Sequence, residues 1–195
     1  MKLSDYKIIL ASNSPRRKEL LSGLDLDYTV KVLPDVDESY PNNINKEDIS
    51  EYISKKKAEA YLPYLKNDTL LITADTLVIM GNDVFGKPKD KEDAKRMLRA
   101  LSGNTHKVIT GVSITTLERQ KTFKVISEVR FSDLEDSEIE YYVSKYNPLD
   151  KAGAYGIQEW IGYVAVENIS GSYFNIMGLP VQKLYQELKK FIGEK

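Results

Sequence analysis

Cysteine is absent from this chain of 195 residues, and histidine occurs only once, at His106. The absence of cysteine excludes disulfides, thiolate nucleophiles and cysteine-ligated zinc. A catalytic triad would depend on His106, and the chain has no Gly-x-Ser-x-Gly motif to accompany it. We therefore interpret His106 as a structural residue in a loop. Any metal site would have to use oxygen ligands, which favour Mg²⁺ or Mn²⁺.

Long apolar runs and an excess of charge of one sign are also missing. No run approaches the ~18 apolar residues that suggest a transmembrane helix, and the first residues lack the pattern of a secretory signal. The net charge is −1, so there is no general attraction to nucleic acid or to anionic membranes. We expect a cytoplasmic globular protein without a nucleic-acid or membrane partner, in which any phosphate binding is local.

The segment Ala-Ser-Asn-Ser-Pro-Arg-Arg, residues 11–17, is the first candidate site. It follows an apolar run typical of a strand, and Ser14 and Pro15 suit the N-cap and the first position of a helix, which Gly23 would end. Arg16 and Arg17 then fall in the first helical turn, where the helix dipole disfavours cations by a few tenths of a kcal/mol. Two arginines beside unpaired backbone N–H groups predict a polyphosphate site, and a solvated arginine pair is the alternative.

Asp75 is the second candidate. It interrupts an apolar run, residues 70–79, that is typical of a buried strand. A lone carboxylate there is costly unless it is paired or bound to a metal. Two interpretations stay open: a carboxylate satisfied by backbone donors or an arginine, or one that accepts a proton from water or holds a metal.

Lysines give a weaker signal. The segment Gly81–Pro88 is nearly a P-loop, but Pro88 replaces the metal-binding Ser or Thr, and a hairpin turn is predicted at residues 81–83. Lys87 on this stiff turn is a candidate phosphate ligand, with a surface lysine as the alternative. Three successive lysines, residues 55–57, lie on a predicted helix, where at most one or two can face one site.

Gln158 follows a glycine-rich segment, residues 151–156. Its carboxamide offers one acceptor and two donors, which can match the imide edge of uracil or thymine. The alternative is an exposed glutamine without a function.

Alternating strand and helix patterns predict an α/β protein with a mixed sheet. We expect strands at residues 8–10, 28–32, 70–80, 108–116, 122–131 and 162–166, with 108–116 and 122–131 antiparallel. We expect helices from Ser14 to Gly23 and at residues 46–65, 91–100, 136–145 and 180–191.

Along nearly its whole length, the chain resembles the Maf family of nucleoside triphosphate pyrophosphatases. The stretch that ends in Gln158 is similar to the subfamily acting on dTTP and UTP. Glu159-Trp160 departs from the pattern, because many relatives have a glycine after the glutamine. The matching segments are residues 11–17, 37–38, 57–58, 74–76, 86–88, 101–106, 110–112, 150–158, 171–175 and 178–180.

The resemblance implies a single Maf-like domain, residues 1–195, with an elongated mixed sheet flanked by helices in two lobes around a central cleft, as in inosine triphosphatase-like folds. It implies attack of water on the α-phosphorus of dTTP or UTP, or of a modified pyrimidine nucleotide, giving the monophosphate and pyrophosphate. It leaves the oligomeric state open, with a homodimer as one option. The implied residues are Asp75 as proton acceptor; Ser12, Arg16, Arg17, Lys57 and Lys87 for phosphate; Arg16, Thr76 and Gln158 for substrate choice; and Glu38 with Asp75 for a divalent metal cation, Mg²⁺ or Mn²⁺.

Two other functions compete with this one. The first is a house-cleaning pyrophosphatase for inosine-type purines, against which the Gln158 stretch argues. The second is a nucleotide-binding or protein-binding regulator of cell division, which retention of a cell phenotype by an Asp75-dead variant would support.

Overall fold

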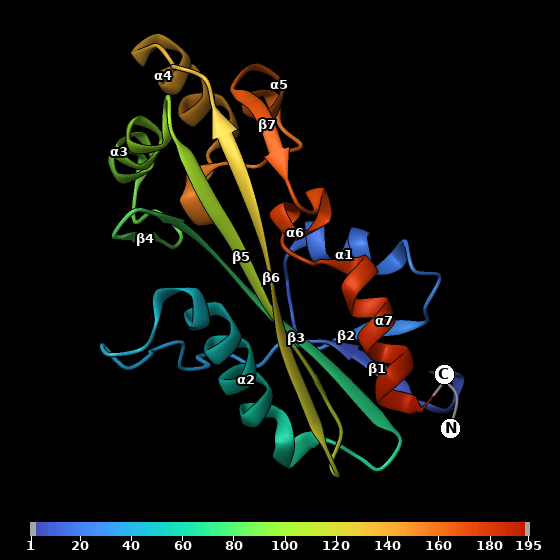
Figure 1. Cartoon of the computed structure of the whole chain (residues 1–195). Helices are drawn as coiled ribbons and strands as arrows, with labels where there is room; N and C mark the ends of the chain where they lie inside the picture. Colours follow the sequence, from blue (N-terminus) through green and yellow to red (C-terminus); the bar gives the residue numbers. More distant parts are fainter. Residues whose placement is uncertain (1–2, 194–195) are drawn as a thin grey trace. The chain divides into compact units, whose positions relative to one another are not determined.

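A computed structural model of the protein describes residues 3–193, which form seven strands and seven α-helices (Figure 1). The strands are β1 (Lys7–Leu10), β2 (Tyr28–Val30), β3 (Thr69–Met80), β4 (Asp83–Phe85), β5 (Thr105–Thr115), β6 (Gln120–Phe131) and β7 (Val166–Ser170). The helices are α1 (Pro15–Ser22), α2 (Ile49–Tyr61), α3 (Lys91–Leu101), α4 (Asp136–Tyr146), α5 (Trp160–Val164), α6 (Tyr173–Met177) and α7 (Val181–Ile192).

The seven strands form one mixed sheet in the order β2-β1-β3-β5-β6-β7, with β4 paired to β3. β1 is parallel to β2 and to β3, and Leu10 of β1 lies opposite Ile72 of β3. β4 and β7 are antiparallel to β3 and β6. The predicted α/β architecture with a mixed sheet is confirmed.

The strand order reverses at β1. The chain leaves β1, forms α1 and returns as β2 on one side, then forms α2 and returns as β3 on the other side. Because parallel crossovers are right-handed, α1 and α2 cover opposite faces of the sheet, as Figure 1 shows. The carboxyl end of β1 is therefore a switch point, where open α/β sheets bind ligands.

Helix α1 begins and ends where the sequence predicts. Pro15 is its first residue, and the Ser14 hydroxyl accepts the backbone N–H of Arg17 at 3.4 Å. Gly23 caps the other end, donating its N–H to the carbonyl of Glu19 at 3.1 Å. Leu21 is fully buried and anchors the helix to the core.

The chain divides into two compact units: residues Met1–Asp75, Thr110–Val125 and Gly178–Lys195 form the first, and Thr76–Ile109 and Ile126–Met177 form the second. In the first unit, α2 approaches β5 closely at Gly111, where a Cβ atom would lie 2.3 Å from the backbone of Ser50 and Glu51. In the second, ion pairs join α3 to α4, including Arg99 with Asp136 at 2.6 Å.

The strand predicted at residues 162–166 is wrong. Residues Trp160–Val164 form α5, and β7 begins only at Val166. The aromatic and β-branched residues of this segment favour a strand, but their tertiary setting overrides that preference. Gly162 lies directly on the carbonyl oxygen of Ile157, which a Cβ atom would approach to 1.7 Å, so the helical turn depends on this close contact.

Two other expectations need correction. The helix predicted at 46–65 is α2 flanked by the 3-10 turns Lys46–Asp48 and Leu62–Tyr64.

His106 lies in strand β5, not in a loop, and is only 1% exposed. It packs edge-on against the rings of Phe131 and Tyr155, and its Nε2 atom lies 2.8 Å from the Tyr155 hydroxyl. Burial lowers the His106 pKa from 6.5 to about 4. Its interpretation as a structural residue agrees with this packing.

The hairpin predicted at residues 81–83 is correct. Met80 and Asp83 are paired across a turn in which Gly81 has a φ of +56°. Between residues 3 and 193, no helix is both long and apolar enough to cross a membrane.

Candidate active site

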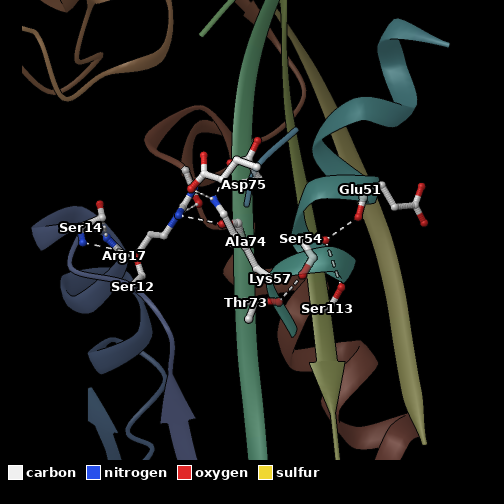
Figure 2. A network of polar contacts seen from close by, with 12 residues as sticks. Ser12, Ser14, Arg17, Glu51, Ser54, Lys57, Thr73, Ala74, Asp75 and Ser113 are labelled. Atoms are coloured by element: carbon white, nitrogen blue, oxygen red, sulfur yellow. Dashed lines mark hydrogen bonds and ion pairs between the residues drawn. The ribbon is translucent and has the colours of Figure 1, made fainter. Parts of the chain in front are cut away.

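The turn after β1 places Arg17 at the switch point of the sheet. Its Nε atom donates to the carbonyl of Gly178 at 2.8 Å. Its Nη1 atom donates to the carbonyl of Ala74 at 2.9 Å, and Figure 2 shows Arg17 beside Ala74. Burial lowers the pKa of Arg17, while the charge of Asp75 opposes that shift. Arg17 thus links α1 to Ala74, the residue before Asp75 in β3, and to Gly178, which precedes α7.

Two serines complete this turn. Ser12 is 7% exposed, and its hydroxyl accepts the backbone N–H of Ser14 at 3.2 Å. Arg16 follows on the first turn of α1 and is half-buried. Hydroxyl groups, guanidinium groups and a helix N-terminus at one turn can bind the oxygens of a phosphate chain.

Lys57 brings two carboxylates together. Its Nζ atom lies 2.8 Å from Oδ1 of Asp75 and 3.0 Å from Oε1 of Glu38. The Asp75 and Lys57 side chains are 12% and 15% exposed, whereas the Glu38 side chain is 53% exposed. Asp75 is thus the inner member of the cluster and is held in a fixed position by an ammonium group, because a buried carboxylate needs such a partner.

A network of buried hydroxyl groups fixes the helix that carries Lys57. The Ser54 hydroxyl donates to the carbonyl of Glu51 at 2.8 Å and lies 3.0 Å from the Ser113 hydroxyl. The Thr73 hydroxyl donates to the carbonyl of Ser54 at 2.7 Å. Figure 2 shows these contacts joining α2 to β3 and β5 beside Asp75, so the network sets the position from which Lys57 reaches the carboxylate.

The acidic loop before α2 is attached by the neighbouring lysine. The Nζ atom of Lys56 lies 2.5 Å from Oδ2 of Asp37 and donates to the carbonyl of Ser39 at 2.9 Å. The hydrogen bond from Lys56, with that from the Ser39 backbone N–H, lowers the Asp37 pKa to about 2. Of the three successive lysines, Lys57 thus points to the site and Lys56 holds the loop that carries Glu38.

Thr76, Lys87 and Gln158 belong to the second unit. Thr76 follows Asp75 in β3 and is half-buried, and Lys87 is exposed in the loop after β4. Lys87 follows the β3–β4 hairpin, and α3 begins only at Lys91, so Lys87 does not stand at the start of a helix as the lysine of a P-loop does. Among the described residues, the Oε1 atom of Gln158 is a buried side-chain acceptor that receives no hydrogen bond.

The glycine-rich segment is joined to the Lys87 loop within this unit. The Gly153 backbone N–H donates to the carbonyl of Gly86 at 3.1 Å. Gly153 has a φ of +68°, and a Cβ atom there would lie 2.8 Å from the side chain of Val78. Only glycine therefore fits this contact, which explains the residue type.

Oxygen ligands for a metal are few. No group of three or more Asp, Glu, His or Cys side chains suited to a metal ion occurs in the described part of the chain. Glu38 and Asp75 converge on a single cation, the Lys57 ammonium group. Mg²⁺ is commonly held by one or two carboxylates together with substrate phosphates and water, so these two residues fit that mode of binding.

Several contacts of the site cannot be read from the sequence. They are the carbonyl acceptors of Arg17 and the hydroxyl network of Ser54, Thr73 and Ser113. The hydroxyl residues inside apolar strands were the available signal, because a buried hydroxyl requires a hydrogen-bond partner.

The fold and the site define an α/β protein with a turn of serine and arginine side chains and a buried, lysine-paired carboxylate at the switch point of its sheet. The sequence model of the family described as "Maf-like protein" matches residues 7–191. The chain belongs to the Maf family, as its motifs predicted.

Curated relatives match over almost their full length. A protein of Bacteroides thetaiotaomicron is 61% identical over 96% of this chain and 97% of its own length. A protein of Porphyromonas gingivalis is 53% identical over 97% of this chain and 96% of its own length. A protein of Flavobacterium johnsoniae is 45% identical over 98% of each chain. Each of these three relatives bears the name dTTP/UTP pyrophosphatase.

Proposed function

We propose that this protein is a nucleoside triphosphate pyrophosphatase that converts dTTP and UTP to the monophosphate and pyrophosphate. Membership of the Maf family and the names of relatives up to 61% identical support this activity. The observation that carries the proposal in the structure is the Lys57 ammonium group between Asp75 and Glu38, beside the arginine turn at the end of β1.

Asp75 is the proton acceptor in this proposal. Its Oδ1 atom is paired with Lys57, which leaves Oδ2 as the oxygen that takes the proton of the attacking water. The water attacks the α-phosphorus, the bond between that phosphorus and the bridging oxygen breaks, and pyrophosphate leaves. Lys57 keeps the carboxylate in position during this step.

The phosphate chain is bound by cationic and hydroxyl groups. Ser12, Arg16 and Arg17 contribute from the turn after β1, together with Lys57 and Lys87. Positive groups that meet the developing charge of the leaving pyrophosphate stabilise the transition state. Arg17 has a second task, since it also binds two backbone carbonyls.

A divalent cation completes the proposed site. Glu38 and Asp75 would hold Mg²⁺ or Mn²⁺ together with phosphate oxygens of the substrate. When bound, the ion supplies positive charge that neutralises the phosphate oxygens.

Gln158 reads the base. Its buried Oε1 atom suits the N3–H donor of uracil or thymine, whereas cytosine presents an acceptor at N3. Thr76 and Arg16 are the other proposed determinants of substrate choice. The cytoplasmic location and the single domain over residues 1–195 are parts of the proposal that rest on the sequence, and the oligomeric state stays open, with a homodimer as one option.

Product analysis tests the proposed function. The protein is incubated with dTTP, UTP, CTP, ITP or GTP in the presence of Mg²⁺ or Mn²⁺. We expect monophosphate and pyrophosphate in equal amounts, fastest from dTTP and UTP. Preferred hydrolysis of ITP would contradict the substrate class.

Asp75→Asn tests the proton acceptor, because asparagine keeps the shape of the side chain and removes the charge that accepts the proton. We expect its activity to fall by at least about 100-fold with the fold retained. Activity within a few-fold of wild type would remove Asp75 from the catalytic role.

A further inference from the structure

Gln158 lies in a tight turn, and the residues at both ends of this turn are hydrogen-bonded to the side chain of Tyr142. The Glu159 backbone N–H donates to the carbonyl of Gly156 at 2.9 Å, which closes a β-turn with Ile157 and Gln158 at its two central positions. The hydroxyl of Tyr142, from helix α4, accepts the Gly156 backbone N–H at 3.0 Å. The same hydroxyl donates to the Oε2 atom of Glu159.

Glu159 is in turn held by a buried cation. The Nζ atom of Lys151 lies 3.1 Å from Oε1 of Glu159 and 2.8 Å from Oδ1 of Asp150, and the Lys151 side chain is only 8% exposed. The Glu159 side chain therefore does not cap α5, although Glu159 occupies the N-cap position of that helix. Both carboxylate oxygens of Glu159 are engaged in fixing the turn.

Close packing leaves the turn little room to move. A Cβ atom at Gly156 would lie 2.9 Å from the side chains of both Glu159 and Lys151. Ile157 is 6% exposed and anchors the first central position in the core of the unit. Burial, together with the hydrogen bond to Glu159, raises the pKa of Tyr142, so its hydroxyl stays protonated and keeps donating.

A carboxamide discriminates uracil from cytosine only if its orientation is fixed. A flipped amide exchanges its donor and its acceptor, so it would match cytosine as well as uracil. The buried Oε1 atom of Gln158 has no partner of its own among the described residues to prevent such a flip. The backbone on which the side chain is mounted sets the distance and angle at which the carboxamide meets the base, so a loose turn would weaken the hydrogen bonds that distinguish uracil from cytosine.

We propose that Tyr142, Glu159 and Lys151 form a clamp that positions Gln158, and that this clamp determines the preference for uracil and thymine over cytosine. Glu159 and Tyr142 act through Gln158 and are positioning residues, not catalytic ones. The inference rests on the proposed reading of the base by Gln158.

The test measures kcat/KM for UTP and for CTP in Tyr142→Phe, Glu159→Gln and wild type. Tyr142→Phe removes the shared hydroxyl, and Glu159→Gln keeps the shape of the side chain but removes its charge. We expect the UTP-to-CTP ratio to fall about three- to tenfold in each, mainly through a higher KM for UTP. Tyr146→Phe is the control, because it makes the same change on a ring that stacks on Tyr142 but takes no part in the contacts described above.

A double-mutant cycle separates positioning from general loosening of the fold. In a Gln158→Ala background, Tyr142→Phe should leave the UTP-to-CTP ratio unchanged, because the group that the clamp orients is gone. If Gln158→Ala lowers the ratio but Tyr142→Phe and Glu159→Gln do not, the clamp is refuted while the reading of the base stands. If Gln158→Ala itself leaves the ratio unchanged, the proposed reading of the base fails, and the clamp fails with it. A fall in the melting temperature of Tyr142→Phe with an unchanged ratio would show a purely structural role.

Discussion

Replacing Arg17 with alanine should destabilise the protein, although the helix dipole alone predicts the opposite. Removing a cation from the first turn of α1 gains a few tenths of a kcal/mol. The same change removes the hydrogen bonds to the carbonyls of Ala74 and Gly178, at 2.9 and 2.8 Å, in a partly buried region. Each carbonyl left without its donor costs about 1–2 kcal/mol, so the net loss of stability is about 2–4 kcal/mol.

Thermal and urea unfolding measure this loss. For a chain of this size, 1 kcal/mol corresponds to about 2–4 °C, so the melting temperature should fall by roughly 4–16 °C. Arg17→Lys keeps the charge but not the forked donors, so it should recover only part of the stability. Arg16→Ala is the matched variant from the same turn and should have the smaller effect. A melting temperature of Arg17→Ala within 2 °C of wild type, on the order of the dipole effect alone, would refute this reasoning.

Three further predictions follow from the charged groups. Since the His106 pKa is lowered to about 4, the unfolded chain takes up a proton below pH 6.5 that the folded chain does not, and stability should fall by up to about 1.4 kcal/mol per pH unit down to about pH 4. This is the chain's one histidine, so its NMR titration is unambiguous, and a midpoint near 6.5 would contradict its burial. The Asp37 pKa of about 2 should rise toward 3.8 in Lys56→Met. In wild type, the stability that this carboxylate contributes is present above about pH 4 and is lost as the pH falls toward 2. An unchanged Asp37 titration in Lys56→Met would show that Lys56 does not hold the loop. Lys57→Met leaves Asp75 without its ammonium partner, so kcat/KM for UTP should fall at least about tenfold, and an unchanged value would exclude the positioning role.

The sequence predicted those parts of the fold that depend on local signals. Ser14 and Pro15 mark the start of α1 because capping is a property of neighbouring residues. The apolar runs likewise mark β1 and β3. The strand predicted at 162–166 was wrong because the contact of Gly162 with Ile157 decides that segment, and no periodicity encodes such a contact.

The candidate site could be predicted as a set of residues but not as a set of partners. Lys57 was one of three successive lysines, and only the position of α2 on β5 shows that it faces Asp75. The acceptors of Arg17 lie 57 and 161 residues further along the chain and are backbone atoms, which leave no trace in the residue types. Glu159 stood out as a departure from the family pattern, but its bonds to Lys151 and Tyr142 required the fold.

The position of bond cleavage tests the central claim most directly. The protein is incubated with UTP and a divalent cation in water enriched in oxygen-18. The products are separated, and their masses are measured by mass spectrometry. Attack on the α-phosphorus predicts UMP that carries one heavy oxygen and pyrophosphate that carries none, with both products lost together in Asp75→Asn. Heavy oxygen in the pyrophosphate, or the appearance of UDP and orthophosphate, would contradict the account.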